Sequence, residues 1–366
     1  MSYCLPFAAI DTAVFPASYA AGRHSWLAQL KEMSCQMKYS PYQCCGVGPE
    51  GESLITDTVW IGSKDASRVL VLIGGTHGVE GFAGTAVQID LLRLITEGLV
   101  VIPANTAVLM IHALTPWGYA WQRRCDADGV DLNRNIVDFS RPLPENKDYE
   151  LLRETFYWPD AIQRKHRLAE FERQHGRAAL EKAISGGQYS DPAGPFYGGK
   201  APAHGRLVTE DLIRKYNLHG RDLAVIDVHT GLGSYGYGEI ICDHDPNSEG
   251  TFAARHWYGD SVALPLLGTS SSVPKTGLLD YAWHTIMNER SCYVTLEFGT
   301  FSTDQLFEIL LRDHQLWAQL DSEQARRLEH SKVMRGHFCP EDRAWREMVL
   351  FRARQVIAQG LQGVSS

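Results

Sequence analysis

The amino-acid sequence predicts an α/β protein, a single domain with a mostly parallel mixed central sheet flanked by helices. Short apolar runs rich in β-branched residues recur along the chain and are typical of buried strands. Segments with apolar residues at helical spacing lie between several of these runs, and this alternation is typical of parallel sheets. The 366 residues, 44% of them hydrophobic, are enough for a sizeable core. The predicted strands are residues 69–73, 107–112, 223–228, 239–242 and 292–296.

Helices are predicted between these strands and in an insertion. Residues 84–95 and 206–216 carry apolar side chains at helical spacing. The pattern changes over residues 138–203, where the charged segment 160–183 is predicted as a helix. The Gly/Pro-rich stretch QYSDPAGPFYGG follows it and is interpreted as a structured loop. We therefore expect residues 138–203 to be an insertion of helix and loop within one domain.

Residues 321–366, rich in Arg, Glu and Ala, predict a C-terminal extension of surface helices packed on the domain that covers residues 1–366.

The net charge of -8, without any basic cluster, disfavours nucleic acid as a partner. No apolar run approaches membrane-spanning length, and the first residues lack the basic start of a secretory signal. The eight cysteines are scattered without a disulfide framework, which favours reduced cysteines in the cytoplasm. No pair has CxxC spacing, which disfavours a cysteine-built zinc site or a redox motif. The cysteines are Cys4, Cys35, Cys44, Cys45, Cys125, Cys242, Cys292 and Cys339.

The segment GGTHGVEG follows the first of these strands and sets His77 three residues before Glu80. Taken alone it fits a strand-to-helix turn in which Glu80 meets the positive end of a helix dipole. Two other predicted strands also end in residues that bind metals or transfer protons, namely His229 and Glu297. Because ligands bind beyond the carboxyl ends of parallel strands, these residues are expected to share one site.

Two histidines and one carboxylate form the ligand set that leaves a catalytic zinc one open position. His77, Glu80 and His229 are the candidate ligands, and this coincidence favours a metal site over a structural turn. Glu297 follows an unbroken apolar strand and precedes Phe298. A carboxylate at that edge can take a proton from an attacking water and later deliver it to a leaving group.

The segment RRCDADGVDLNRN, residues 123–135, holds three arginines and three aspartates. These charges could pair with one another in a solvated loop. Alternatively they form an anion site, because a guanidinium grips a carboxylate through two hydrogen bonds and an adjacent Asn adds a donor. A second arginine nearer the metal would stabilise the oxyanion that develops when water adds to a carbonyl.

These motifs together resemble the zinc carboxypeptidase family, the carboxypeptidase A type metallopeptidases, in a bacterial branch of undefined substrate. More distantly the sequence is similar to the aspartoacylase and succinylglutamate desuccinylase branch, which shares HxxE, LNR and a distal His. The resemblance covers about residues 69–300. In chain order its motifs are HxxE (His77, Glu80), TPWGY (115–119), GVDLNRN (129–135), His229 and TLEFGT (295–300).

The resemblance implies a carboxypeptidase-like fold and one Zn²⁺ per chain, held by His77, Glu80 and His229. It implies that Glu297 is the general base and then the general acid, and that Arg124 polarises the scissile carbonyl.

The same resemblance assigns Asn133 and Arg134 to the carboxylate of the substrate's terminal residue. It places Asp131 as a carboxylate that fixes the first ligand histidine. Asp227 shares a strand face with His229 and could play a similar part.

Several positions depart from the family pattern. Thr115 stands where the family usually has Asn. Arg123 and Arg124 are adjacent, so the sequence leaves open which of the two faces the scissile carbonyl. No tyrosine stands at the spacing before Glu297 where digestive members carry their substrate-capping residue, and Tyr281 is a candidate for that role.

The leading functional prediction is a zinc-dependent hydrolase, a metallocarboxypeptidase that cleaves an amide bond next to a free carboxylate in a small peptide. A close alternative is a deacylase of N-acyl amino acids, and a third is a catalytically silent member that binds a ligand. A nucleotide-binding protein is disfavoured because neither GxGxxG nor a Walker A loop is present, and a serine hydrolase because GxSxG is missing.

Overall fold

The computed structural model describes residues 9–319 and 324–366. Cys4 and the first residues of the predicted C-terminal extension, 321–323, lie outside the described residues. The other seven cysteines are free. No helix of the described residues is long and apolar enough to cross a membrane.

A mixed seven-stranded sheet forms the centre of the fold, in the order β1-β2-β4-β3-β5-β7-β6. The inner strands β4, β3, β5 and β7 are parallel, whereas β1, β2 and β6 pair antiparallel with their neighbours. This confirms the predicted fold class. The strands are β1 (Met37–Val47), β2 (Ser53–Ile61), β3 (Arg68–Gly74), β4 (Thr106–His112), β5 (Asp222–Thr230), β6 (Gly238–Ile241) and β7 (Cys292–Phe298).

The five predicted strands correspond to β3–β7, and β1 and β2 were not predicted. β1 lies at the edge of the sheet, and all but one of its residues stay at least partly exposed, so it lacks a continuous apolar run. The inner strands are buried on both faces because each face carries a helical layer.

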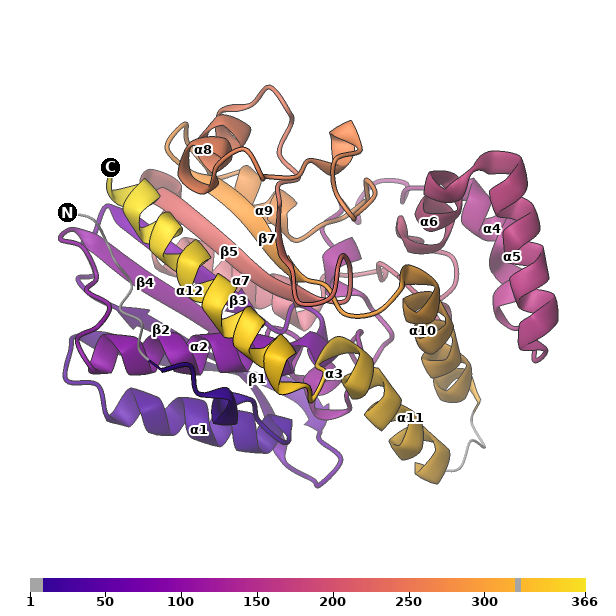
Figure 1. Ribbon diagram of the computed structural model, residues 1–366, viewed down its shortest axis with the longest axis horizontal. Helices are drawn as coiled ribbons and strands as arrows, with labels where there is room; N and C mark the ends of the chain where they lie inside the picture. The colour runs from indigo at the N-terminus through magenta and orange to yellow at the C-terminus, as the bar shows by residue number, and fades with distance from the viewer. Residues whose placement is uncertain (1–8, 320–323) are drawn as a thin grey trace.

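Alternate side chains of the inner strands enter two separate cores. Leu70 and Leu72 point to one face of β3, and Val69, Val71 and Ile73 point to the other. The first face packs against α1 (Tyr19–Lys31), α2 (Gly81–Thr96), α8 (Glu249–Tyr258) and α12 (Arg343–Ser365). The second face packs against α7 (His204–Lys215) and α9 (Asp280–His284). Figure 1 shows α12, α2 and α1 running across the near face of the sheet.

The predicted surface position of the C-terminal helices is wrong for α12. Its side chains Trp345, Val349, Leu350 and Val356 are fully buried in the core on the sheet. The helix therefore forms part of the main layer over β3 and β5.

A third apolar cluster lies beyond the carboxyl ends of the strands, on the right of Figure 1. The predicted helix 160–183 is interrupted there at Gly176, whose φ of +88° suits glycine. The cluster is built by α4 (Lys147–Phe156), α5 (Ala161–His175), α6 (Arg177–Ser185), α10 (Thr303–Ala318) and α11 (Gln324–Phe338). The short helix α3 (Pro116–Ala120) lies beside the turn after β3.

Candidate active site

The carboxyl ends of β3, β5 and β7 place the predicted residues around one cavity. Strand β5 pairs in parallel with β3 on one side and β7 on the other, and His229 is directly opposite Glu297 in this register. His77 and Glu80 lie in the turn after β3. Glu80 is the last residue of a single 3₁₀ turn, Gly78–Glu80, and His77 directly precedes that turn. All four residues line the cavity.

Close backbone packing fixes the turn that carries His77 and Glu80. Gly75 has a φ of +69°, a left-handed conformation that lets the chain leave β3 sharply. A Cβ atom on Gly78 would lie 2.1 Å from the carbonyl carbon of Gly118, so only glycine fits against α3. The turn is therefore fixed by two glycines before any ligand binds.

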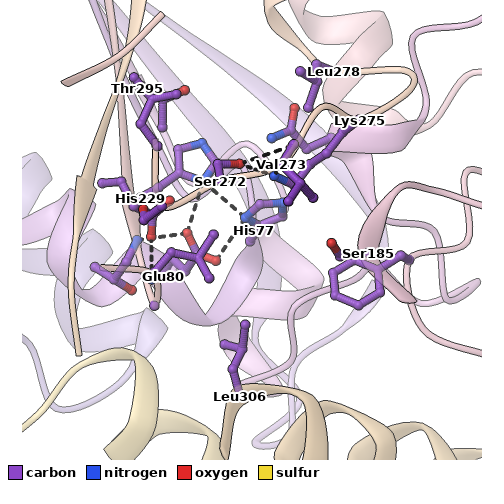
Figure 2. A pocket seen from close by; sticks show the side chains of 18 of the residues that line it. His77, Glu80, Ser185, His229, Ser272, Val273, Lys275, Leu278, Thr295 and Leu306 are labelled. Carbon is purple, nitrogen blue, oxygen red and sulfur yellow. Dashed lines mark hydrogen bonds and ion pairs between the residues drawn. The ribbon is translucent and has the colours of Figure 1, made fainter. Parts of the chain in front are cut away.

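Donor atoms of His77, Glu80 and His229 converge within 4.8 Å of one another. The Nδ1 atom of His77 lies 2.8 Å from Glu80 Oε1, and the Nδ1 atom of His229 lies 3.1 Å from Glu80 Oε2. The two Nδ1 atoms are 3.1 Å apart. Figure 2 shows both rings grouped with the Glu80 carboxylate, and none of the three residues is more than 3% exposed.

The Nε2 atoms of both rings are directed at other carboxylates. His229 Nε2 lies 2.7 Å from Asp227 Oδ2, and Asp227 also accepts hydrogen bonds from the hydroxyls of Thr76 and Tyr293. His77 Nε2 lies 3.2 Å from Asp131 Oδ1. At His229 a carboxylate in this position holds the imidazole so that its Nδ1 presents a lone pair. The donor set therefore fits a metal ion, as expected from the sequence.

Charges within this group shift the pKa values of its members. Burial alone raises the pKa of Glu80, but the charges and hydrogen bonds of His77 and His229 lower it well below its ordinary range. Burial alone lowers the pKa of His229, but Asp227 and Glu80 raise it well above its ordinary value. The site holds a negative carboxylate beside its two imidazoles.

Glu297 stands at the opposite side of this group, at the end of β7. Its Oε1 accepts a hydrogen bond from the main-chain N–H of Leu232 at 3.0 Å. Burial and the negative charge of Glu80 raise the pKa of Glu297 to about 7, although His229 opposes that shift. A buried carboxyl with this pKa can take and return a proton near neutral pH.

The structure distinguishes the two adjacent arginines. Arg124 lines the cavity, where its Nη1 lies 3.2 Å from Glu80 Oε1 and its Nε donates to Asp131 Oδ2 at 2.9 Å. Its Nη2 lies 2.7 Å from His77 Nε2. Arg123 turns away and forms a buried ion pair with Asp313 at 2.7 Å. Arg124 is therefore the arginine that can reach a carbonyl beside the metal donors.

Arg134 is fully buried and also lines the cavity. Its Nε and Nη2 donate to the carbonyl oxygen of Ser185 at 3.0 and 2.7 Å, and its Nη1 donates to the carbonyl oxygen of Asn133 at 2.5 Å. No carboxylate among the described residues lies within ion-pair distance of it. Burial lowers the pKa of Arg134 to about 10, despite the charge of Asp131. This guanidinium still has N–H groups to offer an anion.

The side chain of Asn133 is partly used by the fold. Its Oδ1 accepts a hydrogen bond from the main-chain N–H of Leu279 at 2.7 Å, so its amide N–H₂ is left for a ligand. Tyr281 does not line the cavity, and its hydroxyl donates to the Lys275 carbonyl at 3.0 Å. The structure thus brings Asn133 to the site but not Tyr281.

Charged residues that the sequence analysis did not select complete the cavity, above all Lys275, Asp243 and Asp280. The Nζ of Lys275 donates to the Ser272 hydroxyl and to the Val273 carbonyl, the latter at 3.0 Å. Figure 2 shows Lys275 together with Ser272 and Val273. Burial and the charge of Arg134 lower the pKa of Lys275 to about 8, although Asp243 and Glu297 oppose the shift.

The cavity has an empty volume of about 800 Å³, which includes its opening to solvent. The cluster of α6 and α10 supplies part of its lining through Glu181, Ser185, Leu306 and Phe307. Phe196, in the loop after α6, lies under the guanidinium groups of Arg124 and Arg134 at 5.1 and 5.4 Å from its ring centre. Residues from the predicted insertion therefore border the site.

Residues 15–352 match the family described as "Protein of unknown function (DUF2817)". No curated protein matches the sequence.

The chain is similar to several solved structures at low sequence identity. Carboxypeptidase A from Helicoverpa armigera is 13% identical with a TM-score of 0.52, and the match covers 98% of this chain and 77% of that one. This likeness confirms the predicted carboxypeptidase-like fold. Succinylglutamate desuccinylase from Chromobacterium violaceum is 15% identical with a TM-score of 0.36, covering 87% of this chain and 74% of that one. An aspartoacylase family protein from Mesorhizobium loti is 12% identical with a TM-score of 0.38, covering 84% and 69%.

Proposed function

This chain belongs to the family described as "Protein of unknown function (DUF2817)", and we propose that it is a zinc-dependent hydrolase that cleaves an amide bond adjacent to a free carboxylate. The observation that carries the proposal is the convergence of His77, Glu80 and His229 within 4.8 Å, with Glu297 paired to His229 in the sheet. The same cavity holds the buried Arg134, which has no carboxylate within ion-pair distance among the described residues. A metal site, a proton-transfer group and an anion site thus share one cavity.

His77, Glu80 and His229 would hold the zinc ion, because their donor atoms face one another while Asp131 and Asp227 hold the far side of each ring. When bound, zinc supplies Lewis acidity that favours deprotonation of water and polarises a carbonyl. Two histidines and a carboxylate leave the open position that catalysis needs.

Glu297 takes the proton of the attacking water and delivers it to the nitrogen of the leaving group. Its burial and its pKa of about 7 suit both directions of this transfer. Arg124 lies against Glu80 and Asp131 at the cavity wall, where its guanidinium can donate to the carbonyl oxygen as negative charge develops.

Arg134, with the amide of Asn133, receives the free carboxylate of the substrate. The guanidinium is held by the Ser185 carbonyl before substrate arrives, so little conformational entropy is lost when the carboxylate binds. Its burial strengthens the interaction, because the anion meets it away from bulk water.

The experiment is an assay of the purified full chain, loaded with zinc, on short peptides and N-acyl amino acids. Each substrate is paired with the same compound carrying a C-terminal amide in place of the carboxylate. We expect zinc-dependent hydrolysis of the acids and at least about tenfold lower kcat/KM for the amides, since a charged hydrogen-bonded pair is lost. Equal rates on both members of each pair would contradict the anion site, and no turnover on any acid would contradict the hydrolase.

A further inference from the structure

Two carboxylates in the cavity have no cation within ion-pair distance among the described lysine and arginine side chains. Asp280, at the start of α9, is only 4% exposed, and its Oδ1 accepts no hydrogen bond. Its other oxygen lies 3.5 Å from Nε2 of His284, a contact whose charge depends on protonation of the ring. Asp243, just after β6, makes no side-chain hydrogen bond with any described residue. A buried carboxylate oxygen without a partner is costly, and a ligand cation would offset that cost.

Part of the cavity wall is apolar. Ile241 and Leu278 line the same cavity as the two carboxylates, together with Tyr293 and Thr295. An aliphatic stem can pack on such a wall while a charged group at its tip reaches the carboxylates. The lining thus suits a side chain that is apolar along its length and positively charged at its end.

Lys275 does not neutralise this pair by direct contact. Its Nζ is held by Ser272 and Val273, and neither Asp243 nor Asp280 lies within ion-pair distance of it. Burial raises the pKa of both carboxyls, and the charge of Asp243 raises that of Asp280 further, although the charges of Lys275 and Arg134 oppose the shift at Asp243. An entering cation would favour the ionised form of both.

We propose that the residue whose carboxylate binds Arg134 carries a positively charged side chain, an amine or a guanidine, and that Asp243 and Asp280 receive it. This inference rests on the proposed function, because it names the residue that the hydrolase releases.

The inference can be tested without turnover by calorimetric binding of free amino acids to the zinc-loaded full chain. L-lysine, L-norleucine and L-glutamate have comparable stems and differ in the charge at the tip. We expect L-lysine to bind at least about tenfold more tightly than L-norleucine, and L-glutamate more weakly than either, because one charged hydrogen bond is worth about a factor of ten. Equal affinities for L-lysine and L-norleucine, or a preference for L-glutamate, would overturn the inference.

Variants of Asp243 and Asp280 test whether these two carboxylates cause the preference for L-lysine over L-norleucine. In Asp243→Asn and Asp280→Asn the ratio of lysine to norleucine affinity should fall to within about threefold of unity. Asp245→Asn removes the same charge from an exposed neighbour and should leave the ratio unchanged. Because Asp280 is buried, the binding ratio of Asp280→Asn is interpreted only if that variant unfolds cooperatively on heating. If it does not, the ratio measured for Asp243→Asn tests the assignment. A ratio that survives in Asp243→Asn would overturn the assignment.

The same proteins separate this inference from the proposed function. If N-acyl-norleucine is hydrolysed as fast as N-acyl-lysine, the hydrolase stands and the inference fails. If neither is hydrolysed while L-lysine still binds preferentially, the cation pocket stands and the hydrolase fails.

Discussion

The Nδ1 atoms of His77 and His229 lie 3.1 Å apart, although 152 positions separate the two residues in the chain. Both nitrogens face the Glu80 carboxylate, and both rings are almost fully buried. Two nitrogen lone pairs at this distance repel unless a proton or a metal ion lies between them and the carboxylate. The arrangement therefore suits a shared cation.

Replacing either histidine should remove the metal. His229→Ala and His77→Ala are expected to reduce bound zinc from about one equivalent per chain to near zero, since two ligands rarely hold a structural or catalytic zinc. Elemental analysis of the purified variants measures this directly. His256→Ala, an exposed histidine on α8, serves as the control. Full zinc content in His229→Ala would exclude it as a ligand.

Replacing Glu297 should separate metal binding from chemistry. Glu297→Gln keeps the size of the side chain and is expected to retain zinc, while kcat falls by about 10²–10⁴ because general base catalysis is lost. Glu289→Gln, at an exposed position, should keep the normal kcat. Steady-state kinetics on the best substrate decide between these outcomes, and near-normal kcat in Glu297→Gln would exclude the base.

Substitution of Arg123 should lower stability, whereas substitution of its neighbour Arg124 should lower kcat. Arg123→Met leaves Asp313 buried without its partner and should lower the free energy of unfolding by about 3–5 kcal/mol. The protein that remains folded should keep its kcat. Arg124→Met should instead lower kcat by about 10²-fold, as loss of an oxyanion donor does. Denaturant unfolding and kinetics on both variants test the pair, and reversed behaviour would show that Arg123 faces the carbonyl.

For binding of the substrate carboxylate, the two parallel hydrogen bonds of the Arg134 guanidinium should contribute more than its positive charge alone. Arg134→Lys keeps a cation but cannot make two parallel hydrogen bonds to a carboxylate. We expect KM for acid substrates to rise about tenfold or more, with a smaller change in kcat. A thermal melt verifies that loss of the bonds to the Ser185 carbonyl has not unfolded the variant. An unchanged KM would argue against the carboxylate site.

The pH dependence of KM should report on Lys275. Its pKa of about 8 means that the ammonium is present below pH 7 and largely lost above pH 9. The groups whose charges act on it are Arg134, Arg124, Asp243 and Glu297. Because the cation favours an anionic substrate, KM should rise as the pH passes 8. In Lys275→Arg the rise should shift beyond the measured range, and a rise that stays at pH 8 in that variant would assign it to another group.

Much of the core could be predicted from the sequence because apolar runs that are buried on both faces leave a clear signal. The strands β3, β5 and β7, and the polar residues at their ends, were predicted in this way. Parallel pairing then places those ends together, which is why His229 and Glu297 were expected in one site.

Other features depend on contacts that no local pattern contains. β1 is an edge strand with a mostly exposed surface, and its residues carry no apolar run. The choice between Arg123 and Arg124 depends on Asp313, which is 190 positions away from Arg123. Lys275 lies in an irregular loop, where no periodicity indicates which way a side chain points.

The two hydrogen bonds from Arg134 to the Ser185 carbonyl join the 3₁₀ turn Leu132–Arg134 to the end of α6. Metal donors come from the sheet, whereas the orientation of the anion-binding group is set by a segment that lies outside the sheet. A shortened protein that contains only the sheet and the helices on its two faces would keep the metal donors. It would lose the segment that orients Arg134. Exchanging that outer segment would therefore change how the substrate carboxylate is held while leaving the metal donors in place.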